Sequence, residues 1–331
     1  MPNQLFTNVA LLCIVFCTSF CLGATKSSPP RKRSFEFHYG ASLVDLKPGS
    51  QLRVWIPVPR TTVHQKISWR GFDFSVPVQI AQEPKYGNRI LYFSLTVPPS
   101  GKVDFAAKYL VNRQEVQRAS IRTGKKTLLA KRERRLFLSA NRLVPITPLP
   151  QLFSATPDLD QASSPKRLGR VLYNLVRDHM RYDKSKPGFG NGDVLWACDS
   201  RFGNCTDFHS LFISLARSRQ LPARFEIGFP LPEKHGRGAI GGYHCWASFH
   251  TANEGWMPVD ISEADKHPKL QEYYFGNLTE NRVSFTVGRD LTLVPKQAGP
   301  PLNYFVYPYA EMNGTPLAKK HISLDVRYQD K

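Results

Sequence analysis

The sequence predicts an α+β protein in which an antiparallel β-sandwich domain precedes a mixed domain of helices and strands. Apolar and polar residues alternate repeatedly between residues 34 and 110, and this period of two is typical of half-buried antiparallel strands. After Cys205 the apolar residues recur at spacings of three, four and seven, which is the pattern of one helical face. Segment 242–249 is rich in aromatic residues and is patterned like a strand, and a polar turn separates it from segment 255–260. A chain of 331 residues is long enough for two domains.

Composition and patterning divide the chain into five segments. Hydrophobic residues make up 41% of the chain and aromatic residues 12%, which is enough for proper cores and argues against general disorder. The segments are a signal peptide (1–24), the β-sandwich domain (34–138), a connector rich in Pro, Ser and Thr (139–164), the mixed core (165–275) and a C-terminal β extension (276–331).

The first segment is apolar from Val9 to Leu22 and ends near Ala24. This stretch is shorter than the ~20 residues of a membrane span, so we expect a secretory signal and a secreted, periplasmic or cell-envelope protein. No lysine or arginine precedes the apolar stretch, whereas Lys26 and Arg31 follow it. An uncleaved membrane anchor is therefore the alternative.

The second segment contains four alternating runs that are broken by proline and glycine turns. We expect these runs to form the strands of a scaffold that carries no chemistry of its own. Their apolar positions are Phe35, Phe37 and Tyr39; Leu52, Val54 and Ile56; Leu91, Phe93, Leu95 and Val97; and Val103, Phe105, Ala107 and Tyr109.

The formal net charge of +19 favours anionic partners, such as cell-wall polymers, lipid head groups or acidic proteins. Basic residues concentrate between Arg118 and Arg135, a run that either binds polyanions or forms a solvated basic linker or strand edge. The run lacks interleaved aromatic residues, and we find no nucleic-acid-binding motif, so we do not expect nucleic acid as a partner.

Cys205 is the candidate nucleophile. It lies in the segment GNCTDF (203–208), directly ahead of the predicted helix. The helix dipole and the free N–H groups at a helix N-terminus favour an anion, and they can lower the pKa of a cysteine from ~8.5 to ~3.5–7.5. The alternative is a small buried cysteine that only packs at the start of a core helix.

His244 and Asp260 lie on segments 242–249 and 255–260, which the polar run 251–254 joins as a hairpin. If the hairpin is centred near Ala252, His244 stands directly opposite Asp260, where Cβ atoms are ~4.5–5.5 Å apart. A slip of one residue would place the two side chains on opposite faces. Separately, His244 could be a hydrogen-bonded core histidine and Asp260 a turn carboxylate.

Together, Cys205, His244 and Asp260 form the pattern of a generalised catalytic triad. In such a triad the thiolate attacks a carbonyl carbon, and the imidazole takes the thiol proton and gives it to the leaving amine. The carboxylate fixes the tautomer of the imidazole and stabilises its charged form.

Four motifs, taken as an ordered set, resemble the transglutaminase-like core of bacterial secreted proteins. They are GNCTDF (203–208), LPAR (221–224), HCW (244–246) and WMPVD (256–260), and the resemblance covers about residues 165–265. It implies a papain-like fold with Cys205 as nucleophile, His244 as base and acid, and Asp260 as the orienting carboxylate. It also implies that the N-terminal β domain resembles the one that often precedes this core. Cys245 departs from the family pattern, in which alanine is common at that position.

The oxyanion hole is less defined by the sequence. Papain-like enzymes carry a glutamine shortly before the nucleophile, but Asp199 stands at the comparable place here. We expect the backbone N–H of Cys205 as one donor. The resemblance suggests the Tyr182 hydroxyl as a second donor, although Tyr182 could simply pack at a helix end, and Asn204 is a weaker candidate that could only supply the turn.

The remaining predictions concern the cleft and the cysteines. Trp246 and Trp256 are candidate walls of the substrate cleft, although core packing explains both equally well, and the glycine-rich run 188–192 is expected on the rim. Three cysteines remain after Ala24, namely Cys198, Cys205 and Cys245, and this odd number leaves at least one thiol free. Pairing of Cys198 with Cys245, or with Cys205, stays open. A zinc site from Cys198, Cys205, His209 and His244 lacks the usual spacing, so we expect neither a metal nor a cofactor.

We therefore expect a secreted thiol enzyme that acts on the amide bonds of a protein or peptide substrate. Water would resolve the thioester in a protease or amidase, and a lysine amine would resolve it in a transglutaminase. We favour water, because excluding it requires a closed, dry tunnel. The competing hypothesis is a non-catalytic binding module of the cell envelope that keeps the fold.

Overall fold

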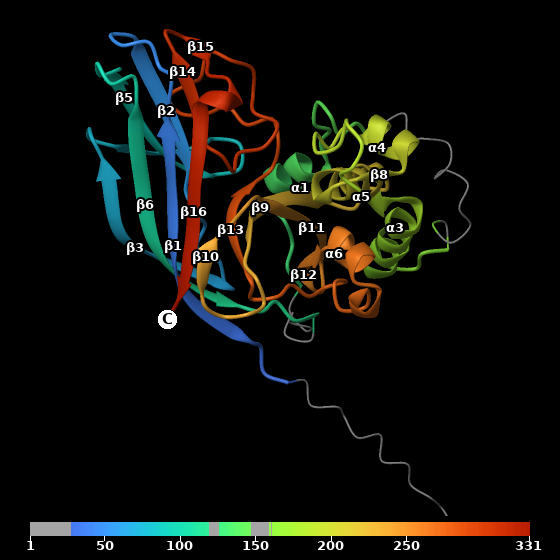
Figure 1. Ribbon diagram of the computed structural model, residues 1–331. Coiled ribbons are helices and arrows are strands. Elements are labelled where there is room, and N and C mark those ends of the chain that lie inside the picture. Colours follow the sequence, from blue (N-terminus) through green and yellow to red (C-terminus); the bar gives the residue numbers. More distant parts are fainter. Residues whose placement is uncertain (1–27, 119–125, 147–158, 160) are drawn as a thin grey trace, which may run out of the picture.

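The computed structural model describes residues 28–118, 126–146, 159 and 161–331. The signal peptide that the sequence predicts for residues 1–24 lies outside the described residues, as do parts of the basic run and of the connector. Figure 1 shows the long strands gathered on one side of the molecule and the helices on the other, with a smaller sheet between them. The predicted α+β class, with a β-sandwich and a mixed core, is confirmed.

The sandwich consists of two five-stranded sheets whose paired strands are all antiparallel. The first has the order β10-β16-β1-β6-β3 and the second the order β15-β14-β2-β5-β4. The first contains β10 (Arg237–Ala239), β16 (Ile322–Asp330), β1 (Lys32–Leu43), β6 (Val103–Gln114) and β3 (Gln65–Phe74). The second contains β15 (Thr315–Pro316), β14 (Tyr309–Met312), β2 (Gln51–Pro57), β5 (Arg89–Thr96) and β4 (Gln79–Gln82).

Strands from the C-terminal end of the chain complete both sheets. β16 pairs with β1 from Phe35↔Asp330 to Leu43↔Ile322, and β14 pairs with β2. The segment predicted as a C-terminal β extension thus supplies strands to the sandwich. Alternation along a strand indicates that one face is buried, but it contains no information about which distant strand is the partner.

The inner face of the sandwich continues into the central sheet. Phe37 and Tyr39 of β1 are fully buried, as their alternation predicts. The ring of Phe37 lies 5.8 Å from that of Phe229, and the ring of Tyr39 lies 5.3 Å from that of Phe285, measured between centroids. These contacts join the sandwich to the core through one continuous set of apolar side chains.

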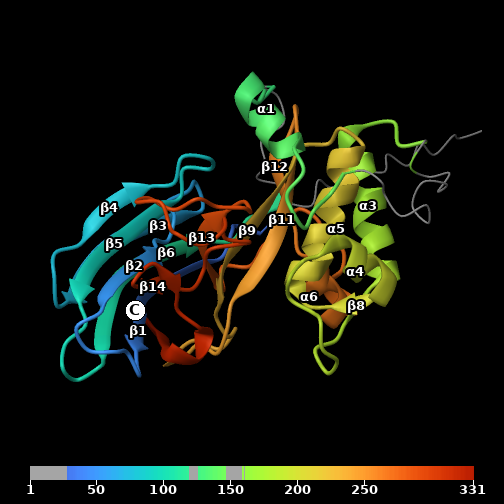
Figure 2. The same cartoon turned by 90° about the horizontal axis from the view of Figure 1, so that it is seen from above.

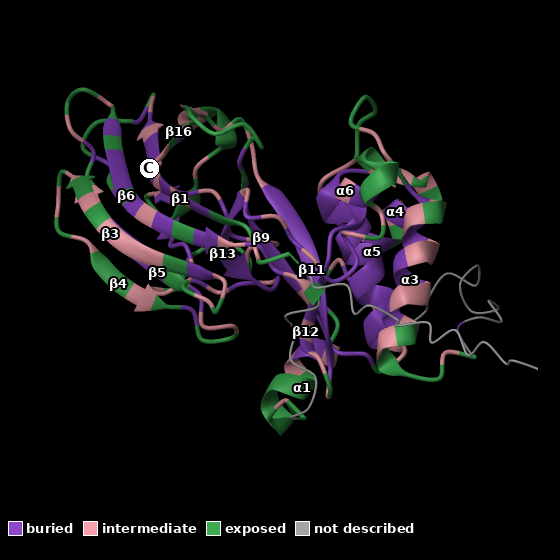
Figure 3. Ribbon diagram, turned by 90° about the horizontal axis from the view of Figure 1, so that it is seen from below, coloured by how far each residue is buried: buried purple, intermediate pink, exposed green. Residues whose placement is uncertain are grey.

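The core is built on an antiparallel sheet of order β12-β11-β9-β13, which stands between the sandwich and the helices (Figure 2). Helix α5 lies between this sheet and α3, so α5 is buried along nearly its whole length whereas α3 has an exposed side (Figure 3). The strands are β9 (Ala223–Pro230), β11 (His244–Thr251), β12 (Gly255–Val259) and β13 (Arg282–Val287), with the short parallel pair β7 (Arg181–Tyr182) and β8 (Phe202–Gly203). The helices are α1 (Lys131–Leu138), α3 (Pro165–His179), α4 (Val194–Ser200), α5 (Cys205–Ser218) and α6 (Ile261–Lys266), with the 3-10 turns η3 (Pro268–Leu270) and η4 (Lys319–His321).

The predicted hairpin is present, but its register differs from the prediction. β11 and β12 pair from Ala247↔Val259 to Thr251↔Gly255, so the turn is centred on Asn253 and not near Ala252. The reason is a three-residue turn, 252–254, that the Thr251 hydroxyl closes by accepting from the Glu254 N–H at 2.9 Å. The partner of each residue is therefore shifted by two positions, which keeps the side chains on their predicted faces. The prediction that His244 stands directly opposite Asp260 is wrong, because the pairing of β11 with β12 begins only at Ala247↔Val259.

Part of the basic run between Arg118 and Arg135 forms helix α1. The side chains of Arg132 and Arg134 are exposed, whereas Phe137 is buried and packs edge-on against Trp256 at 4.9 Å. These residues are therefore a solvated helix face, and not the linker or strand edge that the sequence suggested.

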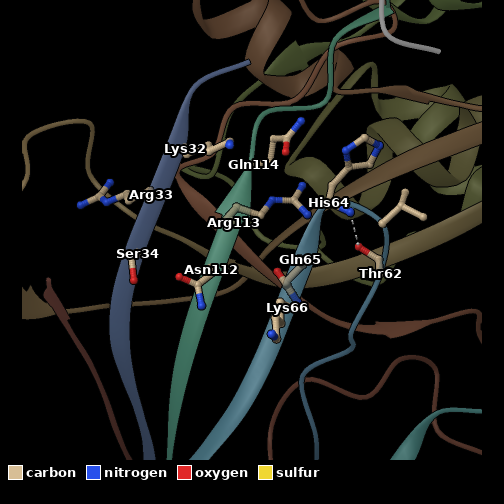
Figure 4. A pocket seen from close by; sticks show the side chains of 11 residues that line it. Lys32, Arg33, Ser34, Thr62, His64, Gln65, Lys66, Asn112, Arg113 and Gln114 are labelled. Carbon is tan, nitrogen blue, oxygen red and sulfur yellow. Dashed lines mark hydrogen bonds between the residues drawn. The ribbon is translucent and has the colours of Figure 1, made fainter. Parts of the chain in front are cut away.

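A cavity of about 390 Å³ lies where β1, β3 and β6 end (Figure 4). Four of its lining residues are lysine or arginine and none is acidic; Arg33, one of the four, is paired with Asp330 at 2.7 Å. The lining residues are Lys32, Arg33, Ser34, Thr62, Val63, His64, Gln65, Lys66, Asn112, Arg113 and Gln114. All of them lie on or next to β1, β3 and β6, so this cavity belongs to the sandwich.

Among the described residues we find no helix that is both long enough and apolar enough to cross a membrane.

Candidate active site

The first turn of α5 is held by its own side chains. Asn204 is the N-cap, and its Oδ1 accepts from the Thr206 N–H at 2.8 Å, while the Asp207 carboxylate accepts from the Asn204 N–H at 2.9 Å. This capping box satisfies N–H groups that a helix start leaves free. Cys205 is therefore the first residue of the helix, as the sequence predicts, and it is buried with 2% of its surface exposed.

Asp207 also fixes the glycine-rich run 188–192. Its carboxylate accepts from the N–H groups of Gly190 at 2.7 Å and Gly192 at 2.9 Å. Gly190 has a φ of 94° and Gly192 a φ of 59°, conformations that glycine adopts without strain. Because Asp207 stands two residues after Cys205, it joins this loop to the nucleophile helix.

His244 and Asp260 meet at the other side of the cluster. His244 Nε2 donates to Asp260 Oδ2 at 2.8 Å, and both side chains are buried. His244 opens β11, and Asp260 is the N-cap of α6, where its Oδ1 accepts from the Glu263 N–H at 3.3 Å. Since Nε2 is bound to the carboxylate, Nδ1 is the ring nitrogen that remains for Cys205.

Arg282 on β13 forms an ion pair with the Asp260 carboxylate. Its Nη1 donates to Asp260 Oδ2 at 2.9 Å, and its guanidinium lies 4.9 Å from the ring centroid of Trp246. Burial alone would raise the pKa of Asp260, but the charges of His244 and Arg282 hold it well below its ordinary value. Asp260 is therefore ionised throughout the physiological range.

The cysteine and the histidine stabilise each other's charged forms. Burial opposes ionisation of Cys205, but hydrogen bonds from Cys245 and His244 bring its pKa well below the ordinary value. Burial likewise disfavours the imidazolium, but the Asp260 charge, the hydrogen bond to Asp260 and the contact with Cys205 raise the pKa of His244 to about 10. Both pKa shifts favour a thiolate–imidazolium pair at neutral pH.

A second histidine, His209, lies on the same helix one turn after Cys205. Its Nε2 accepts from the Ile261 N–H at 3.0 Å, so its Nδ1 carries the proton and donates to the Cys205 carbonyl oxygen at 2.7 Å. Burial lowers the pKa of His209 and keeps the ring neutral. With both nitrogens engaged by the backbone, His209 positions the first turn of α5 and leaves no nitrogen for the zinc site that the sequence left open.

Four half-buried tyrosines surround Cys205. The Tyr243 hydroxyl contacts Thr206 Oγ1 at 2.8 Å and Asn204 Nδ2 at 3.2 Å, and its ring lies 5.5 Å from that of Tyr304 and 5.8 Å from that of Tyr307. Tyr182 is the fourth, and its ring lies 6.4 Å from that of Phe208. Burial raises the pKa of all four, and the negative charge of Cys205 adds to this effect.

Arg289 connects the tyrosines to the rest of the site. It is buried and donates to the backbone carbonyl of Gly192 at 2.9 Å, to Ser210 Oγ at 2.6 Å and to Asn303 Oδ1 at 3.0 Å. Asn303 precedes Tyr304 in the chain. A single arginine therefore holds the glycine-rich run, helix α5 and the segment with Tyr304 in one arrangement.

A cleft of about 480 Å³ opens beside His244. Its lining includes the carboxylates of Glu233 and Glu263 and the buried guanidinium of Arg282. Ligand atoms of His244, Asp260 and Glu263 lie within 4.8 Å of one another, as they would around a metal ion. Arg282 already occupies the Asp260 carboxylate with a positive charge, so we assign this group to the ion pair.

The structure brings together the three side chains that the sequence predicted as a triad. Asn204 acts as the helix cap, and its amide contacts Tyr243, while Tyr182 stands at the edge of the cluster. Trp246, with 1% of its surface exposed, packs between the ring of His244 at 6.2 Å and Arg282. Trp256 lies near the turn end of the hairpin, where it contacts Phe137, His250 and Arg224.

Sequence reasoning missed Arg282, Arg289, Tyr243, Tyr304 and Tyr307 as site residues. Four of these five lie after the last quoted motif, at no fixed spacing from it. Only the fold brings them close to Cys205. Tyr243 alone had a local signal, because it directly precedes His244 on an aromatic strand.

Comparisons with known proteins identify relatives of the core and of the fold. Residues 155–261 match the core of the transglutaminase-like superfamily. An uncharacterized protein of Haemophilus influenzae is 26% identical over 305 residues, which cover 81% of this chain and 82% of that protein.

Two solved structures are similar in fold. The crystal structure of a "putative cysteine protease" from Cytophaga hutchinsonii has a TM-score of 0.51 at 15% identity and covers 90% of this chain and 98% of that one. The periplasmic domain of TgpA from Pseudomonas aeruginosa has a TM-score of 0.35 at 16% identity and covers 75% of this chain and 97% of that one. The likeness to the first structure, with its TM-score above 0.5, supports the fold.

Proposed function

Residues 155–261 belong to the transglutaminase-like superfamily, and on this premise we propose that the protein is a thiol enzyme that acts on amide bonds. The substrate would be a peptide bond or a glutamine side chain in a protein or peptide. The observation that carries the proposal is the buried His244–Asp260 hydrogen bond of 2.8 Å, beside a cysteine, Cys205, whose neighbours lower its pKa well below the ordinary value.

The reaction begins when the Cys205 thiolate attacks the carbonyl carbon of the amide. The His244 imidazolium, which already holds the proton, gives it to the leaving nitrogen as the tetrahedral intermediate breaks down. Ammonia or an amine departs, and the acyl group remains on Cys205 as a thioester. Neutral His244 then takes a proton from water or from an acceptor amine, which attacks the thioester and releases Cys205.

Asp260 and Arg282 hold the imidazole in place for both proton transfers. The carboxylate fixes Nε2 as the protonated nitrogen that faces away from Cys205. Arg282 keeps the carboxylate charged, and its contact with Trp246 limits how far the pair can move.

We propose two groups as hydrogen-bond donors to the oxyanion of the tetrahedral intermediate. One is the backbone N–H of Cys205, because amides at a helix start point toward an anion at that end. The other is the Tyr182 hydroxyl, which the raised pKa keeps protonated and able to donate. The side-chain amide of Asn204 already contacts Tyr243, which favours Tyr182 for this role.

Hydrolysis remains our preferred outcome, with transfer to an amine as the second. The cleft beside His244 contains Glu233 and Glu263, and carboxylates would favour a cationic amine such as a lysine side chain. A glutaminyl peptide incubated with and without a primary amine distinguishes the outcomes by mass. Hydrolysis gives the glutamate product in both samples, and transfer gives the amine adduct.

We also propose that the protein works outside the cytoplasm, at the cell envelope or as a secreted protein. An anionic envelope polymer would fit the basic cavity of the sandwich, which has no acidic lining residue.

Cys205→Ala tests the function directly, with Cys198→Ala as the matched control. Both thiols are buried, but Cys198 lies on α4 and burial raises its pKa. Turnover of casein or a glutaminyl peptide should vanish in the first variant and persist in the second. If Cys205→Ala kept full turnover, or the wild type had none, the non-catalytic binding module would replace this proposal.

A further inference from the structure

Cys245 has no role in the proposed reaction, yet it packs against the first turn of the nucleophile helix. Its Sγ lies 3.8 Å from Thr206 Oγ1 and 3.8 Å from His209 Nδ1. Both neighbours flank Cys205: Thr206 follows it in the chain, and His209 donates to its carbonyl oxygen at 2.7 Å. Cys245 is fully buried.

These contacts place the Cys245 thiol beside the first turn of α5, close to the Cys205 side chain. A hydrogen bond from Cys245 helps to lower the pKa of Cys205, while burial and the neighbouring Cys205 charge raise the pKa of Cys245. One sulfur is therefore a nucleophile, and the other is a protonated thiol beside it. Cys205 and Cys245 both belong to the set of free cysteines, as does Cys198.

We propose that Cys245 is a resolving cysteine, and that a peroxide converts the Cys205–Cys245 pair into a disulfide that reversibly blocks the nucleophile. The packing of Cys245 Sγ at 3.8 Å from both Thr206 and His209, the two residues that adjoin Cys205 in the first turn of α5, carries this inference. Cys205 opens α5 and Cys245 is the second residue of β11, so neither sulfur depends on a mobile loop for its position.

The chemistry balances with a hydroperoxide or hydrogen peroxide as the only co-reactant. The Cys205 thiolate attacks the distal peroxide oxygen, the O–O bond breaks, and sulfur is oxidised by two electrons to the sulfenic acid. The departing alkoxide or hydroxide takes up a proton and leaves as alcohol or water. The Cys245 sulfur then attacks the sulfenic sulfur, the S–S bond forms, and the hydroxyl group leaves as water with the Cys245 proton.

This modification would protect the nucleophile. A sulfenic acid without a neighbouring thiol is oxidised further to the sulfinic acid, which is irreversible in most proteins, whereas a dithiol reduces a disulfide back to two thiols. The S–S bond of ~2.05 Å draws both sulfurs together and removes the lone pair that attacks the substrate. The site would then be inactive until it is reduced.

Peptide mapping of the full chain tests the proposal. Trypsin places the three described cysteines on separate peptides: 185–201 for Cys198, 202–217 for Cys205 and 238–266 for Cys245. After hydrogen peroxide treatment, alkylation of the remaining thiols and digestion without reductant, we expect peptides 202–217 and 238–266 to appear as one linked species. Dithiothreitol should release both.

Two variants sharpen the test. In Cys245→Ala, peptide 202–217 should gain two oxygen atoms as a sulfinic acid that dithiothreitol does not remove. In Cys198→Ala, the linked species should form as in the wild type. A sulfinic acid on wild-type Cys205 with Cys245 still open to alkylation would overturn the proposal, as would a disulfide that involves Cys198.

The wild-type peptide map is decisive even if Cys245→Ala fails to fold. The readout is also independent of enzymatic activity. A linked species in a protein without amidase activity would contradict the proposed function and leave this inference standing.

Discussion

The two sides of Asp260 hold one buried histidine each, and the two histidines behave in opposite ways. His244 Nε2 lies 2.8 Å from the carboxylate, whereas His209 Nε2 lies 3.8 Å from it. The pKa of His244 is raised to about 10, despite the burial that opposes it, while burial lowers the pKa of His209.

Hydrogen-bond partners, and not burial, therefore determine the chemical roles of the two histidines. The backbone engages both nitrogens of His209 through Ile261 and Cys205, so its ring is locked in one neutral tautomer. His244 has a carboxylate on one nitrogen and the thiol near the other, so it can gain and lose a proton. Of the two histidines, only His244 can act as a general acid and base.

The largest expected effect comes from His244→Gln. Removing the general acid and base should lower kcat/KM by ~10²–10⁴-fold on any amide substrate that the wild type turns over. It should also raise the pH midpoint of iodoacetamide labelling of Cys205 to ~8.5 or above, because the thiolate loses its cationic partner. In the wild type this midpoint should lie well below ~8.5. Unchanged labelling in His244→Gln would show that the pair does not form.

Arg282→Met should have the next largest effect, mainly on stability. Removing one partner from a buried charged group costs ~3–5 kcal/mol of unfolding free energy, because Asp260 keeps its charge with one partner fewer. Asp260 has a lowered folded-state pKa, so its contribution is complete above its unfolded value of ~3.9 and is lost as the pH falls through the folded value.

Urea unfolding from pH 3 to pH 7 measures this loss, with Arg224→Met as a control because Arg224 pairs with Glu226 on the same sheet. The gap between wild type and Arg282→Met should narrow below pH ~4 and stay constant above it. A gap that is the same at every pH would contradict the ion-pair explanation.

His209→Gln tests the other side of Asp260. The loss of positioning at the first turn of α5 should lower kcat by roughly 10- to 100-fold and leave KM nearly unchanged, because a small displacement of the nucleophile affects the transition state most. The pH midpoint of Cys205 labelling should stay within about one unit of the wild-type value, since His209 is neutral. A shift as large as that of His244→Gln would mean that the two histidines share the acid–base role.

Cys245→Ala should give the smallest effect on the resting enzyme. It removes one hydrogen bond to the Cys205 thiolate, so the labelling midpoint should rise by about one unit or less, which corresponds to ~1 kcal/mol. Stopped-flow alkylation across pH measures it. A fall in the midpoint would reverse the assigned direction of the hydrogen bond between the thiols.

Local chemistry explains which parts of the site could be predicted from the sequence. The helix after Cys205 follows from its apolar spacing and from Asn204 and Asp207, which cap it within four residues. His244 and Asp260 keep their predicted sides because the pairing is shifted by two residues, an even number that preserves the alternation of faces.

Contacts between distant segments could not be predicted in the same way. Arg282 and Arg289 reach the site through the pairing of β13 with β9, and Tyr304 reaches it through the contact of Arg289 with Asn303. The pairing of β16 with β1 joins residues nearly 300 positions apart, from Phe35 to Asp330. Nothing in the alternation of either strand encodes its partner.

The position of β16 has a consequence for how the chain reaches its native state. β16 lies inside its sheet, with β1 on one side and β10 on the other, and it ends at Asp330. Domains commonly fold one after another as the ribosome releases them, beginning at the N-terminus. Here the N-terminal sheet stays open until β16 has been synthesised, so both parts of the molecule must mature together after that point.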